Sequence, residues 1–513
     1  MPRNLQNIAV VSLSTVGSRI FGLIRDMMIF AALGASIWSS VFLIAFTLPN
    51  LFRRLLGEGA LTSAVVPLFS EVLKQSGKER AFRFLNTVLF RLCFILVVLT
   101  FFLVFALAIG NEIGLLPGRW SLASKFTATL LPYMSFICLA AIVAAVLNIL
   151  GRFFSAACTP ILLNIAMITA LGIGLLLDLP ANQLIWWLCG GVLIGGFLQF
   201  LVPVIDLLLQ GWRPGPGQAE SFLMQELWRL FLPGLLGAAI LQLNILVSRL
   251  LAFSLDESAT SILYLASRLM ELPLGVFTIA VVTVFFPLLA KAFAERDEEA
   301  YSDALLSGMR LVIAVSLPAG IGLIVLGRPI VSTLFEWGAF DNADVAATVP
   351  LIAIYGFGLP FYSVATLATR GLHAGKEMKA PLRVAIICLM VNALSGIVLM
   401  QFFGASGLAM ANVAAAIIQS VLLWRYLSEG HPLFQFGKLK KPLLQILAAG
   451  LTMGLFCLLI SLFFSFLGIP EDVLRFVLVF LIIPLAVTLY FTLLLLLKFE
   501  DIKFFKKIIY RFI

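Results

Sequence analysis

The chain has 513 residues, of which 62% are hydrophobic and only 12% are charged, and its mean hydropathy is +1.09. A soluble domain has about 25% charged residues, so this composition excludes both a soluble protein and a soluble domain with a single membrane anchor. The net charge of +9 would suggest a nucleic-acid partner in a soluble protein, but in a membrane protein it must first be compared with the topology.

Long apolar segments occur fourteen times along the chain, each long enough for a helix of about 20 residues to cross a bilayer. A membrane β-barrel would show short alternating segments instead. We therefore predict an all-α polytopic membrane protein with about 14 transmembrane helices. The predicted spans cover residues 8–33, 37–56, 85–110, 126–150, 159–178, 184–209, 226–253, 262–290, 305–327, 347–372, 382–402, 406–427, 442–467 and 473–497.

The positive charges predict the orientation of these spans. The termini and the loops that follow even-numbered spans share one side, which holds 26 of the 35 Lys and Arg residues, whereas the opposite side holds four. The remaining five, within spans, are Arg19, Arg25, Arg249, Arg268 and Arg370. Since cytoplasmic loops are enriched in cations, both termini are predicted to be cytoplasmic. Topology and contact with anionic membrane lipids then explain the net charge without nucleic acid.

Four pairs of Pro and Gln positions predict an internal repeat, with offsets of 220 to 228 residues. The pairs are Leu48-Pro49 with Leu272-Pro273, Leu131-Pro132 with Leu359-Pro360, Pro160 with Pro381, and Gln199 with Gln419. We predict two parallel six-helix lobes, residues 1–212 and 221–430, joined by a Pro/Gly linker at 213–220. Residues 431–513 add two further helices and a basic cytoplasmic tail.

Charged residues inside the first and eighth predicted spans are expensive in lipid, at about 2.5–3.5 kcal/mol each near the bilayer centre. Arg19 and Asp26 are seven residues apart and share a helix face, while Arg25 lies about 120° round the helix. In the eighth span, Arg268 and Glu271 are three residues apart and are predicted to pair. Pro273, which follows, is expected to kink that span.

These residues include more arginines than acidic residues, and this excess of positive charge predicts an anionic ligand. If the first and eighth spans face the interface between the halves, Arg19, Arg25 and Arg268 converge on one cavity, with Arg53 toward its cytoplasmic mouth. Asp26 and Glu271 cannot neutralise them all. A guanidinium favours a forked partner such as phosphate or carboxylate, so we predict that the cavity binds the phosphate of an anionic substrate.

Other intramembrane arginines have simpler explanations. A lone arginine near a span end usually extends its head group to the membrane surface, which is our preferred interpretation for Arg249 and Arg54. For Arg370, a position that faces a cytoplasmic vestibule is an equally good interpretation. Arg249 and Arg370 are therefore only secondary site candidates.

Sequence patterns for catalysis are missing. The chain has no G-x-x-x-x-G-K-[ST] loop for ATP and no H-E-x-x-H metal motif. Only two histidines occur, His373 and His431, and neither is predicted to bind metal. The six cysteines have no C-x-x-C spacing and are predicted to be core residues. We predict a transporter without metal or cofactor, and not an enzyme.

Several motifs closely resemble the MurJ/MviN family of lipid II flippases. They are S-R-I-F-G-L-I-R-D at 18–26, F-T-L-P-N-L-F-R-R-L-L-G-E-G-A-L-T-S-A-V-V-P-L-F at 46–69, S-R-L-M-E-L-P-L-G-V at 267–276 and R-G-L-H-A-G-K-E-M-K-A-P at 370–381. The likeness covers essentially the whole chain, and the run L-P-N-L-x-R-R-x-x-x-E-G-A is highly specific.

This resemblance implies the fold of the multidrug/oligosaccharidyl-lipid/polysaccharide exporter superfamily, a V-shaped pair of lobes with alternating access. The implied substrate is lipid II, the undecaprenyl-pyrophosphate-linked precursor of peptidoglycan, in the bacterial cytoplasmic (inner) membrane. Arginines matching Arg19, Arg25, Arg53 and Arg268 would hold its pyrophosphate and head group. Asp26 and Glu271 would orient them or alternate as their partners during switching, and the two extra C-terminal helices would form a groove for the lipid tail. The expected form is a monomer, with cell-wall synthesis proteins as further partners.

The chain also departs from the family pattern. Many members carry Asp where this chain has Ser40 and Ser267, so both serines are secondary site candidates and the cavity is expected to be more positive than usual. A gating pair that uses position 40 is not expected here.

Three alternatives to a lipid II flippase stay open at this point. A polysaccharide-lipid flippase or an ion-coupled drug exporter would share the fold, although an exporter of cations should have a net acidic cavity. A non-transporting scaffold that binds lipid-linked precursors would tolerate mutation of Arg25, whereas a flippase would not.

Overall fold

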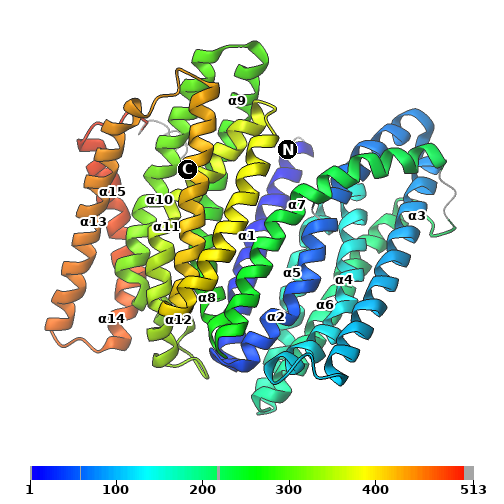
Figure 1. Ribbon diagram of the computed structural model, residues 1–513, viewed down its shortest axis with the longest axis horizontal. Helices are drawn as coiled ribbons and strands as arrows, with labels where there is room; N and C mark the ends of the chain where they lie inside the picture. The colour runs from blue at the N-terminus through cyan, green and yellow to red at the C-terminus, as the bar shows by residue number, and fades with distance from the viewer. Residues whose placement is uncertain (1–2, 58, 217–219, 502–513) are drawn as a thin grey trace. The chain divides into compact units, whose positions relative to one another are not determined.

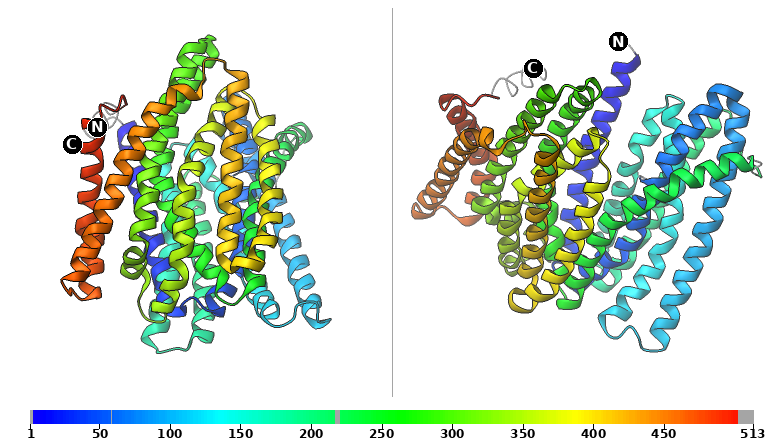
Figure 2. Two further views of the ribbon diagram at one scale, coloured as in Figure 1. Left: turned by 60° about the vertical axis from the view of Figure 1, so that its left-hand side comes forward. Right: turned by 45° about the horizontal axis from the view of Figure 1, so that its top comes forward.

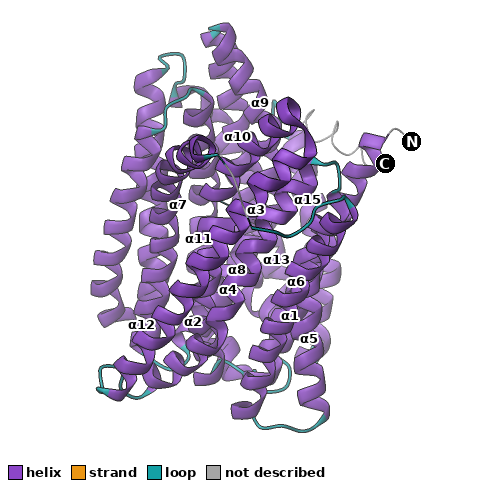
Figure 3. Ribbon diagram, turned by 90° about the vertical axis from the view of Figure 1, so that its right-hand side faces the viewer, coloured by secondary structure: helices purple, strands orange, loops and turns teal. Residues whose placement is uncertain are grey.

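All regular structure in the described part of the chain is helical (Figure 3). The computed structural model describes residues 3–57, 59–216 and 220–501. Helices are the expected form for apolar segments, because a helix pairs its own backbone N–H and C=O groups in a medium that contains no water. The centre of the predicted linker and the end of the basic tail, with Lys503, Lys506, Lys507 and Arg511, lie outside the described residues.

The helices follow one another with short connections (Figure 1). The first part of the chain forms α1 (Arg3–Leu33), α2 (Ile37–Phe52), the π-helix η1 (Arg53–Gly57), α3 (Ala60–Glu112), α4 (Arg119–Ile149), α5 (Phe153–Leu176), α6 (Ala181–Leu209) and α7 (Ser221–Leu255). The second part forms α8 (Ala259–Pro273), η2 (Leu274–Thr278), α9 (Ile279–Glu295), α10 (Glu298–Phe335), α11 (Asn342–Ala374), α12 (Lys379–Gly430), η3 (Phe436–Leu439), α13 (Lys440–Phe466), α14 (Glu471–Val477), η4 (Leu478–Ile482) and α15 (Ile483–Leu496).

Each of the fourteen predicted spans lies within helical structure, to within two residues at either end. Among the described residues, eleven helical stretches are long and apolar enough to cross a membrane. Two of these, Ile37–Glu112 and Lys379–Gly430, each contain two predicted spans. Helix α1 is not among the eleven, and it carries the charged residues Arg19, Arg25 and Asp26. The prediction of an all-helical polytopic membrane protein is confirmed.

Two glycines interrupt the longest helices. Gly77 in α3 has a φ of 81° and Gly404 in α12 has a φ of 56°, and the chain is not helical at either residue. Residues other than glycine are strained in this left-handed backbone conformation. Gly404 separates the predicted spans 382–402 and 406–427. Pro273 has a related effect, because α8 ends there and changes to the π-helix η2, the disturbance expected of a proline without an N–H.

The chain forms two compact units. Unit 1 contains Met1–Phe253 and Trp337–Phe340, and unit 2 contains Ser254–Glu336 and Asp341–Ile513. Helix α7 therefore packs mainly within unit 1, although the repeat assigns it to the second lobe. The lobe boundaries at 212 and 221 rest on the repeat alone and stay a prediction.

Unit 1 is built on α1, α4, α5 and α6. Helix α5 packs against α1 and α6, and α4 packs against α2, α3 and α6 (Figure 1). The fully buried rings of Phe42, Phe69 and Tyr133 belong to its core. The segment Trp337–Phe340 joins this unit, since the N–H of Ala339 donates to the carbonyl of Ala31 at 2.8 Å.

Unit 2 is built around α10 and α11. Helix α11 packs against α10 and α12, and α13 packs against α10 and α15. Helices α13 and α15, orange and red, run side by side in each view (Figures 1 and 2). The hydroxyl of Tyr490 on α15 donates to the carbonyl of Ala314 on α10 at 2.6 Å, which fixes the additional helices to this core.

Large apolar side chains cover much of the outer surface. Phe101, Phe105 and Phe466 are 72%, 64% and 88% exposed. A soluble monomer rarely exposes large contiguous apolar patches. These surfaces are compatible with lipid, as the composition requires.

Candidate functional site

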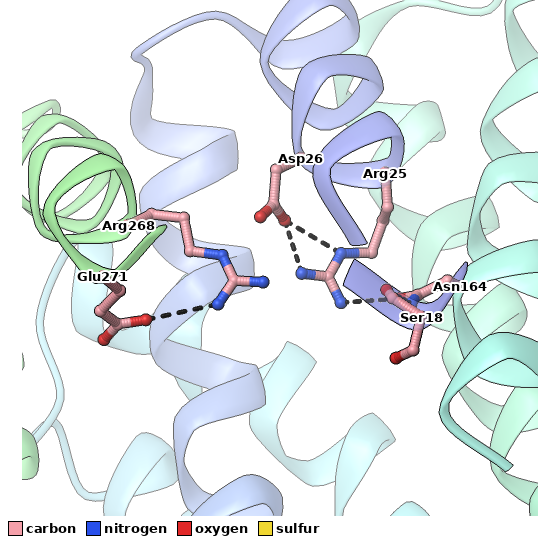
Figure 4. Close-up of polar contacts among 6 residues, drawn as sticks. All are labelled: Ser18, Arg25, Asp26, Asn164, Arg268 and Glu271. Carbon is pink, nitrogen blue, oxygen red and sulfur yellow. Dashed lines mark hydrogen bonds and ion pairs between the residues drawn. The ribbon is translucent and has the colours of Figure 1, made fainter. Parts of the chain in front are cut away.

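Arg25 and Asp26 form a buried ion pair on α1 (Figure 4). The Nε and Nη2 atoms of Arg25 both donate to Oδ1 of Asp26, at 3.0 and 2.6 Å. The Asp26 side chain is 1% exposed and that of Arg25 is 14% exposed. Burial of a carboxylate is costly unless it is paired, and the adjacent guanidinium supplies that pair. Asp26 therefore pairs with Arg25, the residue next to it in the sequence, even though Arg19 is the arginine on the same helix face as Asp26.

Asn164 on α5 completes this network. Its Oδ1 accepts from Nη1 of Arg25 at 3.0 Å, and its Nδ2 donates to the carbonyl of Ser18 at 3.2 Å (Figure 4). The side chain is buried, at 4% exposure. Arg25 is thus held by an anionic partner on its own helix and by a neutral partner on a neighbouring helix.

The other candidates of unit 1 lie on α1, α2 and η1. Arg19 is exposed on α1. Arg53 begins η1 and is half-buried, and its Nε donates to Oδ1 of Asn50 at 2.7 Å, so the Asn and the first Arg of the L-P-N-L-x-R-R motif are bonded to each other. Ser40 is fully buried in the first turns of α2.

Unit 2 contributes a second arginine–carboxylate pair. Nη1 of Arg268 lies 3.3 Å from Oε2 of Glu271 on the same helix, α8 (Figure 4). This confirms the predicted pairing at a spacing of three residues. The pair is more exposed than that of Arg25, with side-chain exposures of 33% and 51%. Ser267 turns back onto its own helix and donates to the carbonyl of Tyr264 at 2.8 Å.

Arg249 and Arg370 differ in their surroundings. Arg249 on α7 is half-buried and donates from Nη1 to Oγ1 of Thr47 on α2 at 2.6 Å. Arg249 therefore contacts another helix, and its extension to the membrane surface stays a prediction. Arg370 is exposed at the end of α11.

The candidates divide between the two units, and in each unit two of the candidates form an arginine–carboxylate pair. Arg19, Arg25, Asp26 and Arg53 belong to unit 1, whereas Arg268 and Glu271 belong to unit 2. Convergence of all of them on one cavity stays a prediction. The two pairs share a chemistry, because each joins a guanidinium to a carboxylate of its own helix.

Asn164 is the residue that the sequence prediction missed. It stands in the apolar run I-L-L-N-I-A-M of the fifth predicted span. A lone amide in such a run needs hydrogen-bond partners inside the membrane, and this is the sequence signal by which Asn164 could have been found. The sequence alone does not place it against Arg25, which is 139 residues earlier.

Comparison with known proteins identifies the family to which this chain belongs. The family model described as "Lipid II flippase MurJ" matches residues 29–478. The chain is 34% identical over 439 residues to the probable lipid II flippase MurJ of Rhizobium meliloti, covering 83% of this chain and 81% of that protein. It is 31% identical over 431 residues to the lipid II flippase MurJ of Burkholderia cenocepacia, covering 81% and 82%.

Solved structures agree with this result. A structure described as "Lipid II flippase MurJ, inward closed conformation" has a TM-score of 0.78 and 27% identity, and the match covers 98% of this chain and all of that one. An inward-facing multidrug transporter of the MATE family shares the fold alone, with a TM-score of 0.67 and 14% identity over 81% of this chain and 95% of its own. The chain belongs to the lipid II flippase MurJ family, whose members are multi-pass membrane transporters of peptidoglycan biosynthesis and not enzymes.

Proposed function

We propose that this protein moves lipid II from the cytoplasmic to the outer leaflet of a bacterial cytoplasmic membrane. Membership in the family and the activity for which its relatives are named support this substrate. The charge distribution supports the orientation, with both termini on the cytoplasmic side. The protein would act as a monomer, with the membrane and cell-wall synthesis proteins as partners.

The observation that carries the proposal is the Arg25 guanidinium, which lies in the first predicted span with its side chain only 14% exposed and pairs with the buried Asp26. Arginine matches the forked oxygen geometry of a phosphate, and a pyrophosphate is the anionic group of lipid II. Arg19, Arg53 and Arg268 would contribute further contacts to the pyrophosphate and head group. Asp26 and Glu271 would hold the guanidiniums between transport cycles and release them as the substrate anion arrives.

Transport would proceed by alternating access, with the head group passing through the protein and the tail remaining in lipid. The additional helices α13 and α15 offer apolar surface for that tail, since Phe463 and Leu485 are 57% and 47% exposed. Movement of charge across the membrane or an ion gradient would supply the energy, and each unit charge that crosses 100 mV contributes about 2.3 kcal/mol.

Complementation tests the proposal. A bacterium depleted of its own lipid II flippase is supplied with the wild-type chain or with Arg25→Ala, at matched membrane levels. We expect rescue by the wild type and none by Arg25→Ala, together with appearance of lipid II in the outer leaflet only for the wild type. Arg425→Ala, which removes an exposed pair with Glu429, serves as the matched arginine control and should rescue growth.

Each contrary result has a defined meaning. If the wild type inserts normally and does not rescue, the substrate assignment is wrong and another lipid-linked precursor or a scaffold role takes its place. If Arg25→Ala also restores outward movement of lipid II, the substrate stands and the central role of Arg25 is lost.

A further inference from the structure

In addition to its ion pair with Asp26, Arg25 donates a hydrogen bond to Asn164 of α5. We propose that Asn164 is a positioning residue, which holds the Arg25 guanidinium in the orientation that receives the pyrophosphate of the transported lipid. This inference rests on the proposed function.

The orientation of the Asn164 amide is fixed from both sides. Arg25 can only donate hydrogen bonds and the Ser18 carbonyl can only accept them. Only one placement of the amide oxygen and nitrogen satisfies both, with Oδ1 toward Arg25 and Nδ2 toward Ser18. Rotation of the amide by 180° would place donor against donor and acceptor against acceptor, so this side chain has a single favourable state.

Helix geometry explains how one amide reaches both partners. Ser18 and Arg25 are seven residues apart and lie on one face of α1, and a helical arginine side chain points toward the N-terminus. Gly22 lies on the turn between them and adds no side chain in the path of the guanidinium. Helices α1 and α5 pack against each other next to this site, where the side chain of Ile161, one turn before Asn164, lies near Gly17.

Asp26 and Asn164, both partners of Arg25, differ in charge, and this difference gives Asn164 its role. Asp26 is an anion and competes with an incoming phosphate for the Nε and Nη2 atoms. The amide of Asn164 is neutral and takes a different nitrogen, Nη1, so it can hold the guanidinium without opposing a second anion. An aspartate in its place would surround Arg25 with two carboxylates and weaken its attraction for phosphate.

The test measures equilibrium binding of purified full-length protein to lipid II and to undecaprenyl pyrophosphate, for Asn164→Leu, Asn164→Asp and wild type. We expect affinity about five- to tenfold weaker for Asn164→Leu and weaker still for Asn164→Asp. Asn164→Gln keeps an acceptor and a donor and should recover part of the loss. In an Arg25→Ala background, Asn164→Leu should have no further effect on binding, because the residue acts through Arg25.

Gln199→Met is the matched control. Gln199 is a buried amide of the same unit, 3% exposed, whose Oε1 accepts from the hydroxyl of Tyr133 and whose Nε2 donates to the carbonyl of Thr159. Like Asn164 it bonds through both ends of its amide, but neither of these partners is charged. Its replacement should leave lipid affinity within twofold of wild type even if thermal stability falls.

The outcomes separate the inference from the proposed function. If wild type binds both pyrophosphate lipids and Asn164→Leu binds them equally well, the positioning role is overturned while the function stands. The positioning role is also overturned if Gln199→Met loses as much affinity, since the effect would then be general to buried amides. If wild type binds neither lipid above a phosphatidylglycerol control, both the function and the inference are overturned.

Discussion

Arg249 on α7 donates a hydrogen bond to the hydroxyl of Thr47 on α2, with 2.6 Å between Nη1 and Oγ1. Thr47 is itself buried and donates to the carbonyl of Leu43, so its hydroxyl serves both helices. Near the end of α7, the ring of Phe253 packs edge-on against Trp120 of α4, with centroids 4.8 Å apart. The C-terminal part of α7 is thereby fixed to unit 1.

Removal of the Arg249–Thr47 contact should destabilise unit 1. Thr47→Val keeps the size of the side chain and removes the acceptor, and Arg249→Leu removes the donor. We expect each to lower the free energy of unfolding by about 1 kcal/mol, with a double variant no worse than the worse single one. Denaturation in mixed micelles measures this, and fully additive losses would show that the two residues do not interact.

Replacement of Arg25 by lysine distinguishes charge from shape. Arg25→Lys retains the positive charge but loses the fork that reaches both Asp26 and Asn164. We expect at least a tenfold loss of lipid II movement at unchanged membrane level, measured by access of lipid II to an outer-leaflet reagent. Full activity of the lysine variant would mean that a point charge is sufficient at this position.

Two glycines on α10 offer a test of close helix packing. A Cβ on Gly320 would overlap the carbonyl oxygen of Gly356 on α11, a backbone atom that has little room to move, whereas Gly322 has no such neighbour within 4 Å. Gly320→Ala should therefore cost about 1–3 kcal/mol of stability, and Gly322→Ala should be neutral or slightly stabilising. Thermal unfolding of the two variants in one detergent checks the contrast, which equal stabilities would contradict.

The ion pair between Arg310 of α10 and Asp501 should hold the segment that follows α15 against α10. The Nε of Arg310 lies 2.5 Å from Oδ2 of Asp501, and both side chains are 15% exposed. A pair this shielded is strongly destabilising when one partner is removed. Arg310→Ala should lower stability by about 2 kcal/mol or more and make residues 497–501 accessible to protease.

The exposed pair of Arg425 with Glu429 is the control for this prediction, with side-chain exposures of 75% and 58%. Solvated pairs contribute about 0–1 kcal/mol, so Arg425→Ala should change stability by less than about 1 kcal/mol. Similar losses for the two arginines would show that burial does not decide the contribution of the Arg310 pair.

The helical architecture follows from the sequence alone. Hydropathy over windows of about 20 residues depends only on local composition, and lipid leaves a helix as the one local way to pair the backbone. Local spacing also predicted the Arg268–Glu271 pair, because residues three apart on a helix are neighbours whatever surrounds them. The break after Pro273 follows equally from one residue that lacks an N–H.

The contacts between residues far apart in the chain, in contrast, depend on how the helices pack. Asn164 meets Arg25 because α5 packs against α1, and Arg249 meets Thr47 because α7 packs within unit 1. A helix pattern gives the direction of a side chain around its own axis, but not which helix lies opposite. Which helix lies opposite depends on the packing of whole helices, and in α1 this packing brings Asn164 into contact with Arg25.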